Sequence, residues 1–191
     1  MNRLPALFLS TLPVLAACNE VPDRAVAAPA ADRDAAVPSP QSENPSMFRT
    51  LTPDMLVAPQ ISVADIATAK EQGVTLIVNN RPDGEAPDQP AGAEIQAAAE
   101  AAGIDYVAIP VGHSGFSAPQ IEALNTALTR HEDGKTLAYC RSGTRSTFLW
   151  SLARAQQGVA PSELARLAGN AGYDISPLTP MLDALSGKAS E

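Results

Sequence analysis

Residues 135–152 read KTLAYCRSGTRSTFLWSL, and this stretch decides the fold. A short run of strand-forming residues meets Cys140, a polar turn containing Gly143 follows, and an apolar-periodic segment begins at once. This order predicts a strand, a loop and a helix. Backbone N–H groups at the start of such a helix have no partner within it and point into the loop. The stretch therefore predicts a cradle for an anion.

Cys140 would lie at the mouth of this cradle, where the positive end of the helix dipole favours a thiolate over a thiol. Arg145 offers a planar fork of N–H donors that suits a tetrahedral oxyanion. A free cysteine is often only a core residue, but the whole pattern indicates a nucleophile and its anion holder. Ser142 and Ser146 are candidate hydrogen-bond donors to the sulfur. Candidate substrate-binding residues in this loop are Arg141, Ser142, Gly143, Thr144 and Ser146.

The composition fits one globular domain and argues against nucleic acid as a partner. The chain has 191 residues with 45% hydrophobic and 4% aromatic side chains, which predicts an aliphatic core. Thirteen Lys and Arg residues stand against 21 Asp and Glu residues, for a net charge of −8. Such a chain lacks the basic surface that binding to a phosphate backbone requires.

Residues 1–17 have the pattern of a bacterial lipoprotein signal. Arg3 supplies a positive charge, residues 4–15 are a short apolar stretch, and Leu-Ala-Ala-Cys ends at Cys18. This tetrapeptide resembles the lipobox, which implies cleavage before Cys18 and lipid attachment to it. The alternatives are an ordinary cleaved signal or an inner-membrane anchor with an incidental cysteine. We expect a membrane-anchored lipoprotein in the periplasm of a Gram-negative bacterium.

Residues 18–46 are rich in Pro, Ala, Asp and Ser and carry almost no large apolar side chains. They cannot bury enough surface to offset their conformational entropy, so we predict a disordered tether. With Cys18 bearing lipid, Cys140 would be a lone thiol in an oxidising compartment and prone to oxidation. A disulfide between them would require the two positions to lie close together, and we do not expect one.

Residues 47–191 predict one α/β domain with three layers and a mainly parallel sheet, because strand and helix patterns alternate. One or two short edge strands are expected within 47–58. The other expected strands are 74–79, 105–111 and 135–139, and the expected helices are 62–73, 91–102, 118–131, one reaching about 157, 162–168 and 178–185. Ligands of such sheets bind at the carboxyl ends of the strands. The loops expected to meet there are 80–90, 112–117 and 140–145.

Four segments together resemble one known family. They are GV followed by NNRPDGE within 73–85, AEAAGIDY at 99–106, AIPV at 108–111 and YCRSGTRS at 139–146. Their order is similar to the beta-lactamase hydrolase-like protein, phosphatase-like domain family, over about 47–155. The resemblance implies the fold of dual-specificity and tyrosine phosphatases, with Cys140 attacking phosphorus and Arg145 holding the phosphoryl oxygens. An Asp from a neighbouring loop would protonate the leaving group.

Two departures from tyrosine phosphatases leave the chemistry open. Four residues separate Cys140 from Arg145, whereas those enzymes have five, and the shorter loop is also typical of rhodanese-type sulfurtransferases, which carry a persulfide. The expected Asp is missing after Val111, where the loop begins Gly-His-Ser-Gly. His113 can act as the acid near neutral pH. The carboxylates of the 80–90 loop are its rivals, Asp83 first and then Glu85 and Asp88.

Arg81 directly follows a predicted strand and is a candidate for a second positive charge in the pocket. Its alternative is a salt bridge to a nearby acid such as Asp83. His131 is predicted to be structural, and Phe148 and Trp150 are predicted to pack. We expect no metal and no cofactor, because no Cys/His cluster has ligand spacing and no nucleotide-binding glycine pattern is present.

Three functions remain open from the sequence. The first is a phosphatase-like hydrolase with a covalent thiol intermediate at Cys140. The second is a rhodanese-like sulfurtransferase that uses the same Cys140 and Arg145 on sulfur. The third is a non-catalytic anion-binding module. The expected partner is a small anion, either a phosphorylated substrate or a sulfane donor.

Overall fold

The computed structural model describes residues 47–188. The predicted signal at 1–17, the lipidation site Cys18 and the tether at 18–46 lie outside the described residues, and so do the last three residues. These assignments, together with the periplasmic location, remain predictions.

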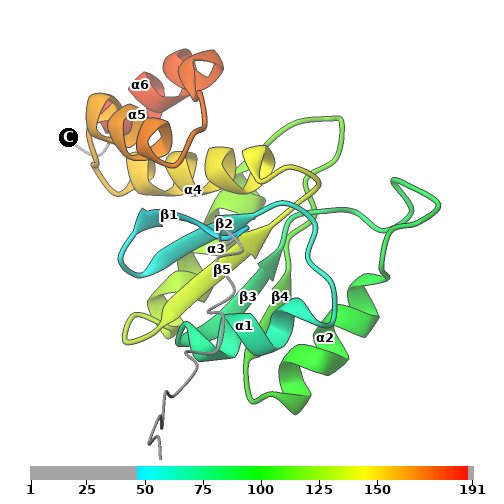
Figure 1. Cartoon of the computed structure of the whole chain (residues 1–191). Coiled ribbons are helices and arrows are strands. Elements are labelled where there is room, and N and C mark those ends of the chain that lie inside the picture. The colour runs from blue at the N-terminus through cyan, green and yellow to red at the C-terminus, as the bar shows by residue number, and fades with distance from the viewer. Residues whose placement is uncertain (1–46, 189–191) are drawn as a thin grey trace, which may run out of the picture. The chain divides into compact units, whose positions relative to one another are not determined.

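A five-stranded sheet forms the centre of the domain (Figure 1). Its strands are β1 (Arg49–Thr52), β2 (Met55–Ala58), β3 (Val74–Asn79), β4 (Asp105–Ala108) and β5 (Lys135–Tyr139). They lie in the order β1-β2-β5-β3-β4. Strands β2, β5, β3 and β4 pair in parallel, and β1 pairs with β2 in antiparallel orientation. The predicted mainly parallel α/β sheet is confirmed.

Helices cover both faces of the sheet (Figure 1). The helices are α1 (Asp65–Glu71), α2 (Gly92–Ala101), α3 (Ala118–Arg130), α4 (Thr144–Gln156), α5 (Pro161–Asn170), the short 3-10 helix η1 (Ser176–Leu178) and α6 (Thr179–Lys188). Helices α1 and α2 pack on one face, and α3 to α6 form the layer on the other. The arrangement has three layers.

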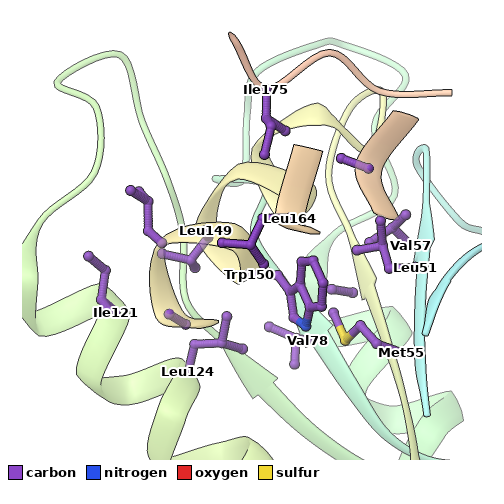
Figure 2. Packing of buried hydrophobic residues seen from close by; sticks show 14 of the residues in the cluster. Leu51, Met55, Val57, Val78, Ile121, Leu124, Leu149, Trp150, Leu164 and Ile175 are labelled. Atoms are coloured by element: carbon purple, nitrogen blue, oxygen red, sulfur yellow. The ribbon is translucent and has the colours of Figure 1, made fainter. Parts of the chain in front are cut away.

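Two hydrophobic clusters hold these layers together because neighbouring strand residues point to opposite faces. Met55 and Val57 contribute to the cluster under α3 to α6, whereas Leu56 and Ala58 contribute to the cluster under α1 and α2. Trp150 of α4 lies in the first cluster, with Val78 and Met55 near its ring (Figure 2). Trp150 is a packing residue, as predicted.

The structure corrects two expectations about the strands. Of the strands expected within 47–58, β1 lies at the edge as predicted, but β2 lies between β1 and β5 and all four of its residues are buried. Strand β4 ends at Ala108 instead of Val111. Pro110 lacks an N–H donor, which agrees with an early end of that strand. The predicted boundaries of β3 and β5 match the structure.

Within residues 47–188, no helix combines the length and apolar character needed to cross a membrane.

Candidate active site

Three loops meet at the carboxyl ends of the parallel strands. The N–H of Asn80 donates to the carbonyl of Tyr139 over 2.8 Å, and the N–H of Val111 donates to the carbonyl of Asn80 over 3.0 Å. These bonds join the ends of β3 and β5 to the segment after β4. The loops that begin at Asn80, Gly112 and Cys140 are therefore brought to one place, as parallel strands predict.

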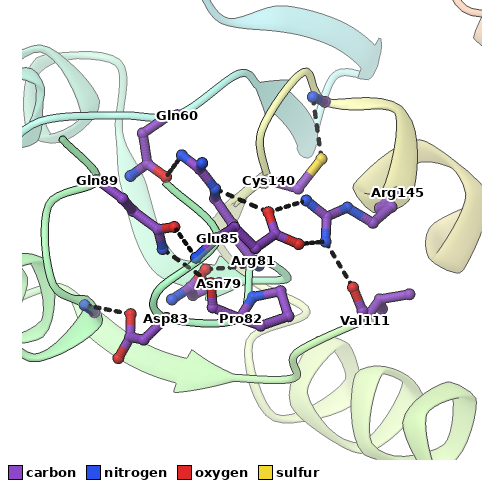
Figure 3. A network of polar contacts seen from close by, with 12 residues as sticks. Gln60, Asn79, Arg81, Pro82, Asp83, Glu85, Gln89, Val111, Cys140 and Arg145 are labelled. Atoms are coloured by element: carbon purple, nitrogen blue, oxygen red, sulfur yellow. Dashed lines mark hydrogen bonds and ion pairs between the residues drawn. The ribbon is translucent and has the colours of Figure 1, made fainter. Parts of the chain in front are cut away.

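Cys140 comes directly after β5 and is fully buried. The backbone N–H of Gly143 donates to its sulfur over 3.1 Å (Figure 3). Gly143 has a φ of +89°, a conformation that L side chains rarely adopt, and α4 begins at the next residue. The turn thus aims a backbone donor at Cys140 at the positive end of a helix, where negative charge on sulfur is stabilised.

Arg145 lies in the first turn of α4 and binds Glu85 with two hydrogen bonds (Figure 3). Its Nη1 donates to Oε1 over 2.6 Å and its Nη2 donates to Oε2 over 2.7 Å. Nη1 also donates to the carbonyl of Val111 over 2.7 Å. The guanidinium is therefore held in one orientation by groups from two different loops.

Glu85 is in turn shared with Arg81. The Nε of Arg81 donates to Oε2 over 3.0 Å, and its Nη1 donates to Oε1 of Gln60 over 2.9 Å. The hydrogen bond from Arg145 is the largest cause that lowers the pKa of Glu85 to about 2, and Arg81 adds to it. The same pair raises the pKa of Arg145, and Cys140 raises it further. Glu85 is an anion at neutral pH.

A pocket of about 250 Å³ opens beside this pair. Its lining residues are Glu85, Gly112, His113, Arg141 and Arg145. Each of the three loops contributes at least one of them. The lining carries two guanidinium groups, those of Arg141 and Arg145, and one carboxylate, that of Glu85. This excess of positive charge suits a small anion.

His113 and Arg141 are both exposed at this pocket. Asp83 does not line this pocket. Its Oδ1 accepts a hydrogen bond from the N–H of Gly92 over 2.9 Å at the start of α2, and it lines a separate pocket with Tyr106. Asp88 is exposed. The structure brings His113 to Arg145 but leaves Asp83 as a cap of α2.

The other predicted loop residues have these positions. Ser142 donates through Oγ to the hydroxyl of Thr144 over 3.1 Å. The Oγ of Ser146 is buried and has no hydrogen-bond partner among residues 47–188. The sulfur of Cys140 thus accepts from the Gly143 backbone instead of from either predicted serine.

Arg81 does not line the pocket beside Arg145. It is 5% exposed and pairs with Glu85, so the predicted salt bridge exists but with a different acid from Asp83. His131 lies 3.6 Å from Asp105 at the edge strand β4, which suits its predicted structural role.

Sequence reasoning missed three contacts. Gln60 reaches Arg81, the carbonyl of Val111 accepts from Arg145, and Tyr173 reaches the Cys140 loop from the segment after α5. A carbonyl acceptor carries no sequence signal. The sequence presents Glu85 as a candidate acid, although a glutamate in a loop that meets two arginines also fits an ion pair.

No group of three or more His, Cys, Asp or Glu side chains in the described part of the chain could hold a metal ion.

Comparison with curated proteins gives relatives of one kind. Beta-lactamase hydrolase-like protein of Agrobacterium fabrum is 34% identical over 133 residues, which cover 69% of this chain and 31% of that protein. The protein of the same name from Xylella fastidiosa is 31% identical over 130 residues, covering 68% of this chain and 30% of the relative. The chain therefore spans about a third of the length of these relatives.

Solved structures of other proteins are similar to the same region of this chain. A candidate phosphatase from Neisseria meningitidis is 31% identical with a TM-score of 0.62, covering 72% of this chain and 96% of that one. Tk-PTP in its active form has a TM-score of 0.60 at 14% identity, covering 75% and 98%, and so shows the fold alone. The fold is that of tyrosine-phosphatase-like proteins. The family model described as "Beta-lactamase hydrolase-like protein, phosphatase-like domain" matches residues 47–157, and the chain belongs to this family.

Proposed function

We propose that this protein is a Cys-dependent phosphatase-like hydrolase that works through a covalent intermediate on Cys140. The observation that carries the proposal is the N–H of Gly143, 3.1 Å from the Cys140 sulfur at the start of α4. That donor and the helix dipole favour a thiolate. Cys140 helps to raise the pKa of Arg145, which supports a cation close to the nucleophile, and Arg145 lines the pocket that would admit the substrate.

The first step forms a bond between the Cys140 sulfur and phosphorus and breaks the bond from phosphorus to the leaving oxygen. Glu85 and Val111 take three of the roughly five N–H donors of Arg145. The remaining donors stabilise the phosphoryl oxygens as charge develops. Water then attacks phosphorus, inorganic phosphate leaves, and the thiolate is restored.

His113 is the proposed proton donor to the leaving oxygen. It lines the pocket with Arg145, and an imidazole is a common general acid in enzymes. Glu85 is unsuited to this role because its pairing with Arg145 holds its pKa at about 2. Asp83, another predicted acid, would first have to leave Gly92.

A sulfurtransferase is the second candidate, favoured by one observation. The pocket lining contains one carboxylate, Glu85, and this carboxylate is held ionised by Arg145. Persulfide formation does not need a protonated carboxyl group that donates a proton to the leaving group. The Cys140 thiolate would attack the outer sulfur of a sulfane donor such as thiosulfate. A sulfur–sulfur bond forms on Cys140, the donor's own sulfur–sulfur bond breaks, and sulfite leaves.

The test is the intact mass of the protein and of Cys140→Ser after incubation with thiosulfate, beside an assay of phosphate release from para-nitrophenyl phosphate. Phosphate release that requires Cys140, without a sulfur adduct, supports the hydrolase. A gain of one sulfur atom that requires Cys140 and is removed by cyanide, without phosphate release, replaces it by the sulfurtransferase. Neither signal, with retained phosphate binding, favours an anion-binding module.

We further propose that the protein is anchored in a membrane through lipid on Cys18, so that the pocket works in the periplasm. The support is the Leu-Ala-Ala-Cys sequence at 15–18. Expression in a Gram-negative host followed by fractionation tests this. Loss of membrane association in Cys18→Ser supports the anchor, and equal association of both forms rejects it.

A further inference from the structure

The peptide group between Ser142 and Gly143 makes a polar contact at each end. Its N–H donates to the Cys140 sulfur over 3.1 Å, and its carbonyl accepts from the hydroxyl of Tyr173 over 3.3 Å. A trans peptide group is planar, and its N–H and C=O point in opposite directions. A contact that holds the carbonyl therefore also directs the N–H.

Tyr173 comes from a part of the chain that the family model does not cover. It follows α5, whereas the match ends at residue 157. Its side chain is largely buried, and burial is the main cause that raises its pKa. The hydroxyl therefore stays protonated at neutral pH and remains a hydrogen-bond donor.

Arg49 of β1 contacts the ring of Tyr173 through its guanidinium group. The guanidinium carbon lies 5.2 Å from the centre of the Tyr173 ring, which is a cation–π distance. Arg49 also donates through Nη1 to the carbonyl of Ala171 over 3.2 Å. The ring is thus held between the first strand and the Cys140 loop.

Gly143 and Tyr173 fit against each other. A Cβ atom added at Gly143 would collide with the hydroxyl of Tyr173, and the φ of +89° at Gly143 already disfavours side chains. The tyrosine therefore occupies the space that any larger residue in the turn would need.

We propose that Tyr173 is a positioning residue that orients the Ser142–Gly143 peptide so that its N–H points at the Cys140 sulfur. The proposal rests on the proposed function in one respect, namely that Cys140 works as a thiolate. Arg49 acts one step further away by holding the ring. A hydroxyl–carbonyl distance of 3.3 Å is long for such a bond, so the expected effect is modest.

The experiment measures the pH midpoint of the ultraviolet thiolate absorbance. It uses the full chain carrying Cys18→Ser, so that Cys140 is the remaining thiol, with a further Cys140→Ser variant as the baseline. Tyr173→Phe removes the hydroxyl and keeps the ring. We expect its midpoint to rise by about half a pH unit, the equivalent of one ordinary hydrogen bond.

The matched control is Tyr106→Phe. Its hydroxyl accepts from Asn79 over 2.9 Å and lies 3.4 Å from the hydroxyl of Tyr139 at the end of β5, but in the described structure it has no bond to residues 140–145. Its midpoint should equal that of the parent. A rise of the same size in Tyr106→Phe would show that loss of any buried hydroxyl has this effect, which overturns the proposal.

A second variant covers the case in which Tyr173→Phe loses its fold, as checked by thermal melting. Arg49→Met keeps the hydroxyl but removes the cation over the ring, and it should give a smaller upward shift. An unchanged midpoint in every variant that melts like the parent overturns the proposal.

Phosphate release is measured in parallel. Its absence from the parent would reject the proposed function, while the midpoints still decide the role of Tyr173.

Discussion

Arg145 and Glu85 form a two-bond ion pair at the centre of the candidate active site, with N–O distances of 2.6 and 2.7 Å. The two residues are 60 positions apart in the chain and lie in different loops. The pair fixes the orientation of the Arg145 guanidinium before any substrate binds. Under the proposed function, Glu85 would therefore act through Arg145.

Glu85→Gln should lower kcat/KM for phosphate release about tenfold, because a neutral amide cannot hold the guanidinium with two charged bonds. Glu94→Gln, at an exposed glutamate of α2, is the control and should match the parent. The measurement is steady-state kinetics with para-nitrophenyl phosphate. A rise in kcat/KM for Glu85→Gln would mean that Glu85 competes with the substrate for Arg145.

The Glu85 pair should also make stability depend on pH. Its pKa falls from 4.5 to about 2 on folding. A lowered carboxyl pKa contributes stability that is present above the unfolded value and is lost as pH falls through the folded value. The melting temperature of the parent should therefore exceed that of Glu85→Gln at pH 7, and the gap should narrow between about pH 4.5 and about pH 2. A gap that stays constant over this range would contradict the assigned pKa.

Arg145→Lys should reduce turnover about a hundredfold, because an ammonium cannot bind Glu85 and a phosphoryl group with a planar fork. Arg154→Lys is the matched control on the same helix. Arg154 lies near the other end of α4 and bonds Gln157 over 2.8 Å. Turnover of the two variants is compared under identical conditions. Equal losses would show that the effect comes from α4 as a whole.

His113→Gln should lower kcat about tenfold for phosphate esters with a poor leaving group and leave good leaving groups nearly unchanged, since only the former need a proton. Asp83→Asn provides the comparison. Because Asp83 caps α2 through Gly92, its loss should lower stability by about 1 kcal/mol and spare turnover. A leaving-group dependence in Asp83→Asn but not in His113→Gln would assign the acid to Asp83.

Gly143→Ala should destabilise the protein by at least about 1–2 kcal/mol, from the positive φ and from the collision with Tyr173. Gly169→Ala is the control. Gly169 lies in α5 with open space where an added Cβ would sit, so alanine should stabilise the helix by about 0.5–1 kcal/mol. Urea denaturation measures both. A Gly143→Ala variant as stable as the parent would show that the turn can adopt another conformation.

The sequence alone predicted the layered α/β fold and the place of Cys140 and Arg145, because strand and helix patterns are local and cysteine before a glycine turn is a compact signal. The limits of β3 and β5 followed from continuous apolar runs. The end of β4 and the central place of β2 did not follow, since pairing partners are distant in the chain.

Only the tertiary structure decided what surrounds the sulfur and the guanidinium. Glu85, Val111 and Tyr173 reach the Cys140 loop from three separate segments, through contacts that span more than 30 residues in each case. Two of these contacts are to backbone carbonyls, those of Val111 and Ser142. Every residue has a carbonyl, so no residue type marks such a contact in the sequence. Local composition determines which elements form and which groups can react. Their orientation depends on long-range contacts that exist only once the sheet has assembled.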